Sequence, residues 1–460
     1  MIHNHGLRGG PARNHRLRLR NSLAAATLVV LAIVSPGCAT HADRLREVRN
    51  AYYGNSIETA GALLDQDIKK YGREADALRL DRAMIDLAAG RPKEAEQILR
   101  QVRDSFDYLQ QPSVAEKAAS MLTDDTHLAY AGEDYEKVLI RAFLALSNLM
   151  QNGGDARAYA LQVSDVQEQI IQSGGAGAEQ NPKLAYQRVA LGEYIHGMLR
   201  EETHMDFQDA ARSWVKVCSW EPGFPYGRLD VDRAMHGHHS EPGHGVLYVF
   251  TLVGRGPYKK EVVEPASTIA MFAASAVVSA TARHTVPPSV APIKVPKVVV
   301  SMNPTHAVQV SVDRQFAGTT ATITDVGRLA VAQYDAVYPR VVIRAVVRRA
   351  AKEGIVYGAK EALKTKNNSL TNLAMDLGGI VWEATESADT RCWGLLPDRI
   401  QVLRLELPAG QHQIGLKPDA GFVPPVESQK TVGIADGRNT YLMATFVDGR
   451  LIGNVLANQN

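Results

Sequence analysis

The one cluster of side chains with possible ligand chemistry is a group of four histidines in a Gly- and Pro-containing stretch, namely His236, His238, His239 and His244. Neutral imidazoles are good ligands for zinc, copper or nickel, and a flexible loop can fold them around one ion. No carboxylate or cysteine completes a recognisable ligand spacing beside them. A metal site is therefore one hypothesis for this stretch. A solvent-exposed polar loop, or a loop with one histidine packed on the following strand, is the other.

Other patterns that mark catalytic sites are missing from the sequence. It contains no Walker loop, no GxGxxG turn, no GxSxG elbow, no HExxH helix and no paired CxxC. The 460 residues are 45% apolar and 22% charged, which is ordinary globular composition with enough length for two or three domains. These features favour a folded binding protein over an enzyme with a familiar motif, and they exclude a disordered or collagen-like chain.

The N-terminus has the order of a signal peptide. A basic stretch at residues 16–20 precedes an apolar run at residues 23–34, and small residues follow directly before Cys38. The apolar run is about a dozen residues, whereas a helix needs roughly 20 to span a bilayer. The sequence therefore predicts that residues 1–37 are a signal peptide that is removed.

The residues Ser35-Pro36-Gly37-Cys38 resemble the lipobox of bacterial lipoproteins, in which the cysteine becomes the lipidated first residue of the mature chain. Ser35 stands where that pattern usually has an aliphatic residue. The resemblance implies a covalent lipid on Cys38 that tethers the chain to a membrane, and it implies no other cofactor. Because Ala39 is not the aspartate that commonly retains lipoproteins in the inner membrane, we expect an outer-membrane protein facing the periplasm. An ordinary secretory signal with a coincidental cysteine is the alternative.

The charge of the mature chain argues against nucleic acid as a partner. The formal net charge is +2, but five arginines and no acid precede Cys38, so their removal leaves −3. A mildly acidic protein lacks the basic surface that phosphate-backbone binding needs. The five residues are Arg8, Arg13, Arg16, Arg18 and Arg20.

Two cysteines remain in the mature chain besides the lipidated one. Cys218 and Cys392 could form a single disulfide in an oxidising compartment, and two buried free thiols fit the count equally well. Neither has nearby residues that would mark a nucleophile.

Residues 38–222 have the sequence pattern of a helical-repeat domain, with apolar residues recurring every three or four positions. Gly90, Ala95 and Leu99 have the spacing of the second half of a tetratricopeptide repeat. A second copy comprises Gly197, Phe207, Ala210, Trp214, Val217 and Pro222. The glycine turns at positions 54, 90 and 132 are 36 and 42 residues apart, whereas the strict repeat is about 34 residues long. An irregular helical bundle is therefore the alternative to a regular solenoid.

The rest of the chain reads as a connection followed by a mixed domain, which makes the fold class α+β. Residues 223–300 combine the histidine-rich loop, a strand at 246–253, an apolar run at 266–282 and a Pro-rich linker. Residues 301–460 begin with a strand at 307–312 and two helices at 329–364 and 370–388, the first broken or kinked by Pro339. Strands at 400–407, 412–416, 431–434 and 441–446, separated by glycine turns, predict a small antiparallel β-sandwich.

The segment from Asp389 to Pro397 lies between two tryptophans, Trp382 and Trp393. It could form a surface site, but tryptophans that join a helix to a strand are more often packed in a core. Together with the turn at residues 405–410 and the lipobox-like Cys38, this segment resembles an uncharacterised family of bacterial lipoproteins. That resemblance implies a location in the cell envelope and supplies no activity.

Three functions follow from these observations. The leading one is a membrane-tethered, non-catalytic scaffold that binds an envelope protein or peptide through the groove of its helical repeats. The second is a metal-dependent or cell-wall-directed enzyme that uses the loop from His236 to His244. The third is a carbohydrate-binding role for the C-terminal strands.

Overall fold

The computed structural model describes residues 40–110, 129–174, 181–265, 292–364, 387–420 and 424–458, without the side chains of Arg73, Ala420 and residues 350–364. Within them, Thr40–Gly354 and Ser387–Asn460 belong to one compact unit, and the rest of the chain is assigned to a second. Cys38, the apolar run at 266–282 and the expected helix over 370–386, including Trp382, lie outside the described residues.

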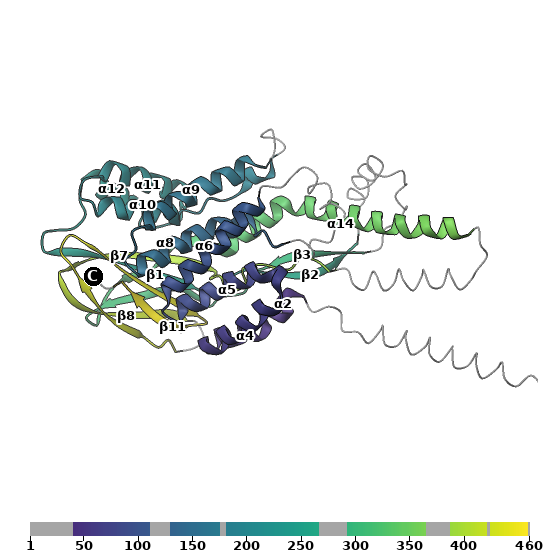
Figure 1. Ribbon diagram of the computed structural model, residues 1–460. Coiled ribbons are helices and arrows are strands. Elements are labelled where there is room, and N and C mark those ends of the chain that lie inside the picture. The colour runs from purple at the N-terminus through teal and green to yellow at the C-terminus, as the bar shows by residue number, and fades with distance from the viewer. Residues whose placement is uncertain are drawn as a thin grey trace, which may run out of the picture. The chain divides into compact units, whose positions relative to one another are not determined.

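The first part of the compact unit is helical, as the sequence predicts. The helices are α2 (His41–Arg44), α3 (Arg46–Tyr53), α4 (Ile57–Lys70), α5 (Ala75–Ala88), α6 (Pro92–Leu109), α8 (Asp134–Met150), α9 (Ala156–Gln172), α10 (Leu191–Glu201), α11 (Phe207–Trp220) and α12 (Gly227–Met235). Short 3₁₀ helices occupy Gly72–Glu74 and Pro182–Ala185. From α3 onward each of these helices packs against the next one along the chain, which gives the antiparallel stack visible in Figure 1.

The structure shows why glycine is required at two positions of this helical stack. Gly90 joins α5 to α6 with a φ of +84°, a backbone conformation that strongly favours glycine. Gly197 faces Trp214, and a Cβ at this position would lie 2.9 Å from the indole ring. The close approach of α10 to α11 at the expected small residue is therefore real, and it lets Trp214 be fully buried.

The strands form three sheets within the described residues. The five-stranded sheet has the order β11 (Arg450–Ala457), β10 (Asn439–Val447), β1 (His244–Val253), β7 (Arg399–Pro408) and β6 (Ala321–Asp325). The four-stranded sheet has the order β5 (Gln315–Thr319), β4 (Thr305–Val312), β8 (Gly410–Ala420) and β9 (Ser428–Ile434). β2 (Tyr258–Glu264) and β3 (Ile293–Val299) pair separately. All ladders are antiparallel except that of β1 with β10.

Strand β1 is buried along almost its whole length because both faces of its sheet are covered. Its residues Val246, Tyr248 and Phe250 belong to the core shared with the helices. The alternate residues Leu247 and Val249 belong to a second core shared with the four-stranded sheet. A strand covered on both sides reads as a continuous apolar run rather than an alternating one, which is why the sequence shows it so clearly. β1 comes from the expected connection, yet it is the central strand of the sheet.

The long helix α14 (Val326–Lys364) corrects one expectation, because it continues through Pro339 as a single helix instead of breaking there. Proline removes one backbone N–H from the helix and opposes the carbonyl four residues earlier. Both Pro339 and Asp335 are exposed, so water can satisfy the unpaired carbonyl.

Two other segments also differ from the expected loop and linker. Residues 227–235 of the expected histidine-rich loop form helix α12, and Pro296 of the expected linker lies within strand β3, which pairs with β2 alone among the described strands. Proline is tolerated there because an edge strand leaves one side of its backbone unpaired.

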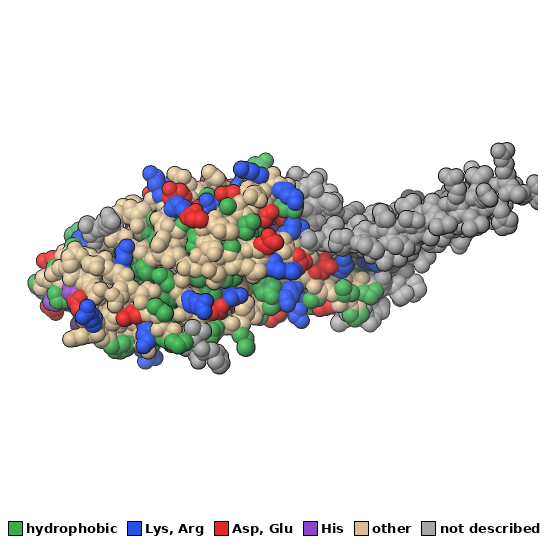
Figure 2. Space-filling model, turned by 90° about the horizontal axis from the view of Figure 1, so that it is seen from below, with side chains coloured by type: hydrophobic (Ala, Val, Ile, Leu, Met, Phe, Trp, Pro, Cys, Tyr) green, Lys and Arg blue, Asp and Glu red, His purple; other side chains and the backbone are tan. Residues whose placement is uncertain are grey.

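The surface of the compact unit carries both signs of charge. On the face seen in Figure 2, basic and acidic side chains are interspersed between apolar ones. In the described part of the chain, we find no helix that combines the length and the apolar composition needed to cross a bilayer.

Candidate functional site

The inner side of the helical stack holds a segment of the chain itself. Residues 387–398 lead into β7 without regular secondary structure, and three of their backbone N–H groups donate to carboxylates of other elements. Leu395 donates to Asp81 Oδ1 on α5, Trp393 donates to Glu136 Oε1 on α8 and Ala388 donates to Glu261 Oε2 on β2, each at 2.7 Å. We refer to residues 387–398 as the clamped segment.

The clamped segment is buried as well as hydrogen-bonded. Trp393 and Cys392 are fully buried, and the ring of Trp393 lies 5.3 Å from that of Phe143, centroid to centroid. The prediction that Trp393 packs in the core is confirmed. The segment therefore occupies part of the inner helical surface that a separate peptide would otherwise reach.

The two carboxyl groups that hold this segment have unusual acidities. Burial raises the pKa of Asp81 to about 7, although the positive charge of Arg49 and the N–H of Leu395 act in the opposite direction. Burial, and then the charge of Glu133, raises the pKa of Glu136 to about 7, against hydrogen bonds from Trp393 and Tyr130. The two carboxyl groups that hold the clamped segment, Asp81 and Glu136, therefore change their charge near neutral pH.

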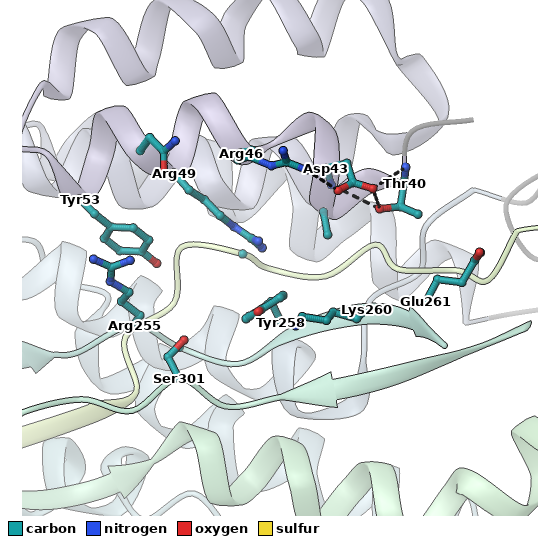
Figure 3. A pocket seen from close by; sticks show the side chains of 14 residues that line it. Thr40, Asp43, Arg46, Arg49, Tyr53, Arg255, Tyr258, Lys260, Glu261 and Ser301 are labelled. Carbon is teal, nitrogen blue, oxygen red and sulfur yellow. Dashed lines mark hydrogen bonds and ion pairs between the residues drawn. The ribbon is translucent and has the colours of Figure 1, made fainter. Parts of the chain in front are cut away.

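A cavity of about 600 Å³ opens between α3 and β2, beside Gly394 of the clamped segment (Figure 3). We call it the basic pocket. It is lined by Thr40, Ala42, Asp43, Arg46, Arg49, Asn50, Tyr53, Arg255, Gly256, Tyr258, Lys260, Glu261, Ser301 and Gly394. The four basic residues of this lining outnumber the two acidic ones, so the pocket has a positive balance.

Arg49 is the central cation of the basic pocket. Its guanidinium carbon lies 5.0 Å from the ring centroid of Tyr258, and Lys260 Nζ lies 5.8 Å from the same centroid. The Nε and Nη2 atoms of Arg49 are buried and have no hydrogen-bond partner among the described residues. Buried donors of this kind normally have an acceptor. A Cβ at Gly394 would lie 2.7 Å from Nη2 and 3.3 Å from Nε of Arg49, so both donors face the clamped segment, near Asp81 Oδ2.

The acidic side chains of the basic pocket are already engaged. Asp43 accepts from Arg46 at 2.7 Å, and Glu261 pairs with Lys294 at 3.2 Å besides accepting the N–H of Ala388. Arg255 pairs with Asp448, which is not part of the lining, at 2.5 Å. Arg49 and Lys260 are thus the cations of the pocket for which no ion pair with a described residue is recorded.

A second cavity, of about 870 Å³, follows the helical stack across three consecutive helices. We call it the helical groove. Its lining is Arg103, Asp104, Asp107 and Gln110 of α6, Asp134, Lys137 and Arg141 of α8, Gln162, Asp165, Val166, Gln169 and Ile170 of α9, and Ser173 and Lys183. One guanidinium nitrogen of Arg141 contacts both carboxylate oxygens of Asp107 at 2.6 Å, which ties α8 to α6.

The four histidines of the predicted metal loop have separate partners. His236 ends α12 with its Nδ1 2.8 Å from the carbonyl of Asp232, and His239 places Nε2 2.9 Å from Asn439 Oδ1. His238 lies 3.9 Å from Glu241, and His244 begins β1. Burial lowers the pKa of His239 to about 4. Among the residues that the structure describes, no three His, Cys, Asp or Glu side chains are grouped closely enough to hold a metal ion.

Cys218 and Cys392 are both free thiols, so the disulfide that the sequence allowed is not formed in the structure. Burial raises the pKa of Cys392 to about 11, and burial also raises the pKa of Cys218. A raised pKa keeps a thiol protonated and unreactive, which fits a packing role for both side chains.

Sequence reasoning missed the residues that build these sites. Asp81 lies between Leu78 and Ile85 on the buried face of α5, and Glu136 shares the buried face of α8 with Ile140 and Phe143. An acid at a core-facing helical position is a signal that could have singled out both, because buried charges need partners. Arg49 carries a weaker signal, since α3 is short and strongly amphipathic.

Comparisons with known proteins give no relative from which a function could be taken. No protein-family model matches the chain, no curated protein is detectably similar to it, and no solved structure matches its fold. The resemblance to bacterial lipoproteins therefore stays a prediction from the sequence.

Proposed function

We propose that this chain is a lipid-anchored, non-catalytic scaffold of the bacterial cell envelope that binds a protein partner through the helical groove. The anchor is the lipid on Cys38, and the location is the outer membrane, facing the periplasm. In finer detail, the proposal takes the helices as tetratricopeptide-like repeats and the two larger sheets as a β-sandwich. The observation that carries the binding role is the polar groove across α6, α8 and α9.

The chemistry of the helical groove suits an extended polar segment. Its walls alternate in charge, with Asp104 and Asp165 as acids and Lys183 as a base. The three helices bury their apolar side chains in one core, so these groups are held on a rigid frame. A preformed surface of this kind loses little conformational entropy on binding, which favours recognition of a flexible peptide.

The clamped segment explains why the binding surface differs from the inner face that a repeat array usually offers. Trp393 and Leu395 fill that inner face, together with the strands of the five-stranded sheet. A partner of the helices therefore has the helical groove as its polar site, and the apolar inner face serves folding.

The decisive experiment is cross-linking in living cells followed by capture from solubilised membranes. Three proteins are compared: wild type, a groove variant with Asp165→Arg and Gln169→Arg on α9, and a control with Glu94→Arg and Gln97→Arg on α6. All four positions are exposed, and only the first pair lines the groove. The two variants thus make the same change of charge at two surfaces, because each replaces one acid and one glutamine by arginine.

We expect a recurrent envelope partner that the wild type and the control capture equally, with at least a tenfold loss in the groove variant. Like charges placed against a complementary surface cost several kcal/mol, and about 1.4 kcal/mol is already tenfold. Undiminished capture by the groove variant would show that the partner binds elsewhere. In the same cells Cys38→Ser should leave the membrane fraction, and retention of that variant would refute the lipid anchor.

A further inference from the structure

The basic pocket contains two cations, Arg49 and Lys260, for which no ion pair with a described residue is recorded. Two buried nitrogen donors of Arg49 have no hydrogen-bond partner among the described residues, and Lys260 Nζ lies 5.8 Å from the centroid of the tyrosine ring that Arg49 also approaches. In Figure 3, Arg49 reaches from α3 toward β2, and Tyr258 and Lys260 lie on the strand below it. A guanidinium fork next to an ammonium group is the arrangement that recognises phosphate oxygens.

The β2–β3 ladder adds an independent observation. Lys260 lies directly opposite Lys297 in its register. Side chains at directly opposed positions have Cβ atoms about 5 Å apart, and like charges there are destabilising. An anion bound next to Lys260 would reduce that repulsion. The opposed lysines therefore favour a negatively charged ligand, as the guanidinium of Arg49 does.

From these contacts we propose that the basic pocket binds a phosphate group, and that the phosphate belongs to the headgroup of a membrane phospholipid. The guanidinium of Arg49 would donate to the phosphate oxygens, and Lys260 would neutralise the second charge. The volume of about 600 Å³ exceeds what a lone phosphate needs, which leaves room for a substituent beside Tyr53 and Tyr258.

The lipid source rests on the proposed anchor at Cys38. Thr40 lines the basic pocket, and it lies two residues after Cys38 in the sequence. An extended chain covers at most about 3.6 Å per residue, so the Cα atoms of Thr40 and a lipidated Cys38 are no more than about 7 Å apart. A tether that short keeps the pocket at the level of the phospholipid headgroups.

The rim of the basic pocket also suits a membrane surface. Ser301 lines the pocket, and its neighbours Val300 and Met302 have exposed fractions of 40% and 98%. Apolar side chains that flank a cationic pocket can enter the interfacial layer while the cations contact phosphates.

The test uses the full-length, lipidated chain purified in a phosphate-free, non-ionic detergent. Native mass spectrometry measures phospholipid that remains bound, and calorimetric titration measures the affinity for inorganic phosphate. The variants are Arg49→Gln and Lys260→Gln, with Lys430→Gln as the matched control on an exposed strand position of β9. Lys260 is exposed, so Lys260→Gln keeps the test valid if Arg49→Gln fails to fold.

We expect one retained phospholipid per chain and at least a tenfold lower affinity for phosphate in each pocket variant, with no change in Lys430→Gln. Hydrogen bonds to charged groups have energies that correspond to tenfold or more in affinity. Phosphate binding with this dependence but without retained phospholipid would support the phosphate site and refute the lipid source. Equal binding by all variants, or no binding, would overturn the proposal.

The same titration on Cys38→Ser separates this inference from the proposed anchor. If the pocket is a phosphate site, inorganic phosphate should bind Cys38→Ser with the wild-type affinity, whether or not the wild-type chain is lipidated. A loss of phosphate binding in Cys38→Ser would refute a preformed pocket.

Discussion

Asp81 and Glu136 should make the stability of the chain depend on pH in the direction opposite to that of acids held ionised by ion pairs. Both pKa values are raised to about 7 in the folded protein, compared with 3.8 and 4.5 for the unperturbed groups. The folded state therefore holds more protons than the unfolded state between about pH 4 and pH 7. The resulting stabilisation is fully present below the unperturbed pKa values and is lost as pH rises through 7.

The size of the effect follows from the difference between the pH and the raised pKa. At pH 5.5 each group is about 1.5 units below its folded pKa and mostly ionised when unfolded, and one unit corresponds to about 1.4 kcal/mol. Each group thus contributes about 2 kcal/mol at pH 5.5 that is missing at pH 8.5. A double variant with Asp81→Asn and Glu136→Gln cannot titrate at these positions. Between these pH values the free energy of unfolding of the wild type should fall by about 4 kcal/mol relative to the double variant.

The comparison with the double variant is necessary because histidines act in the opposite direction. Burial lowers the pKa values of His41, His196 and His239, so below about pH 6.5 the unfolded state binds more protons and the stability that these groups contribute grows as pH rises toward that value. These groups titrate in both proteins, and their effect cancels in the difference.

The assay is urea unfolding followed by tryptophan fluorescence at half-unit steps from pH 5.5 to pH 8.5. Exposed acids provide the matched control, with Asp104→Asn and Glu94→Gln made in the same way. A difference from wild type that does not change with pH for the Asp81 and Glu136 double variant would refute the raised pKa values. A difference of the opposite sign would mean that Arg49 and the backbone N–H groups hold the two carboxylates ionised.

Three further outcomes follow from the packing. Trp393→Ala should lower the free energy of unfolding by about 3–5 kcal/mol and Trp393→Phe by less than about 1.5 kcal/mol, because only the first empties a fully buried site, and equal losses in denaturant titrations would contradict this. Gly453→Ala should lower the melting temperature by several degrees, since its Cβ would lie 1.9 Å from the carbonyl oxygen of Ala88 at a φ of +68°, and an unchanged melting temperature would argue against that contact. Cys392 should react with a thiol reagent only after unfolding while the half-buried Cys218 reacts slowly in the native chain, and rapid labelling of both would show that the clamped segment opens.

Local patterns predicted the elements whose signal is contained in a few neighbouring residues. The helices of residues 40–222 and the strand at 246–253 have strong periodic or continuous apolar signals, and the structure has them. Strands β2, β5, β6 and β11 were missed. Charged residues in β2 and a glycine and an asparagine in β11 weaken the strand pattern there. The helix through Pro339 was predicted to end or bend because the exposure of that proline is not visible in the sequence.

The candidate sites were not predictable from local patterns because their partners are far apart in the chain. Asp81 accepts a hydrogen bond from the N–H of Leu395, 314 positions later, and Glu136 accepts one from the N–H of Trp393, 257 positions later. The sequence could mark each acid as unusual, but only the packing of β1 between β7 and β10 brings the clamped segment to the helices. The histidine loop shows the reverse case, since proximity in sequence did not group three of these side chains closely enough to hold a metal ion in the part of the chain that the structure describes.

The position of β1 also sets the order in which this chain can fold. β1 is made before both of its neighbours, and the final strand returns to the first helices through the Gly453 N–H, which donates to Asn55 Oδ1 across 398 residues at 2.7 Å. Contacts of such long range close slowly, and until β10 and β11 exist the apolar inner surface of the helices is only partly covered. We therefore expect a chain shortened by its last twenty residues to aggregate as it is made.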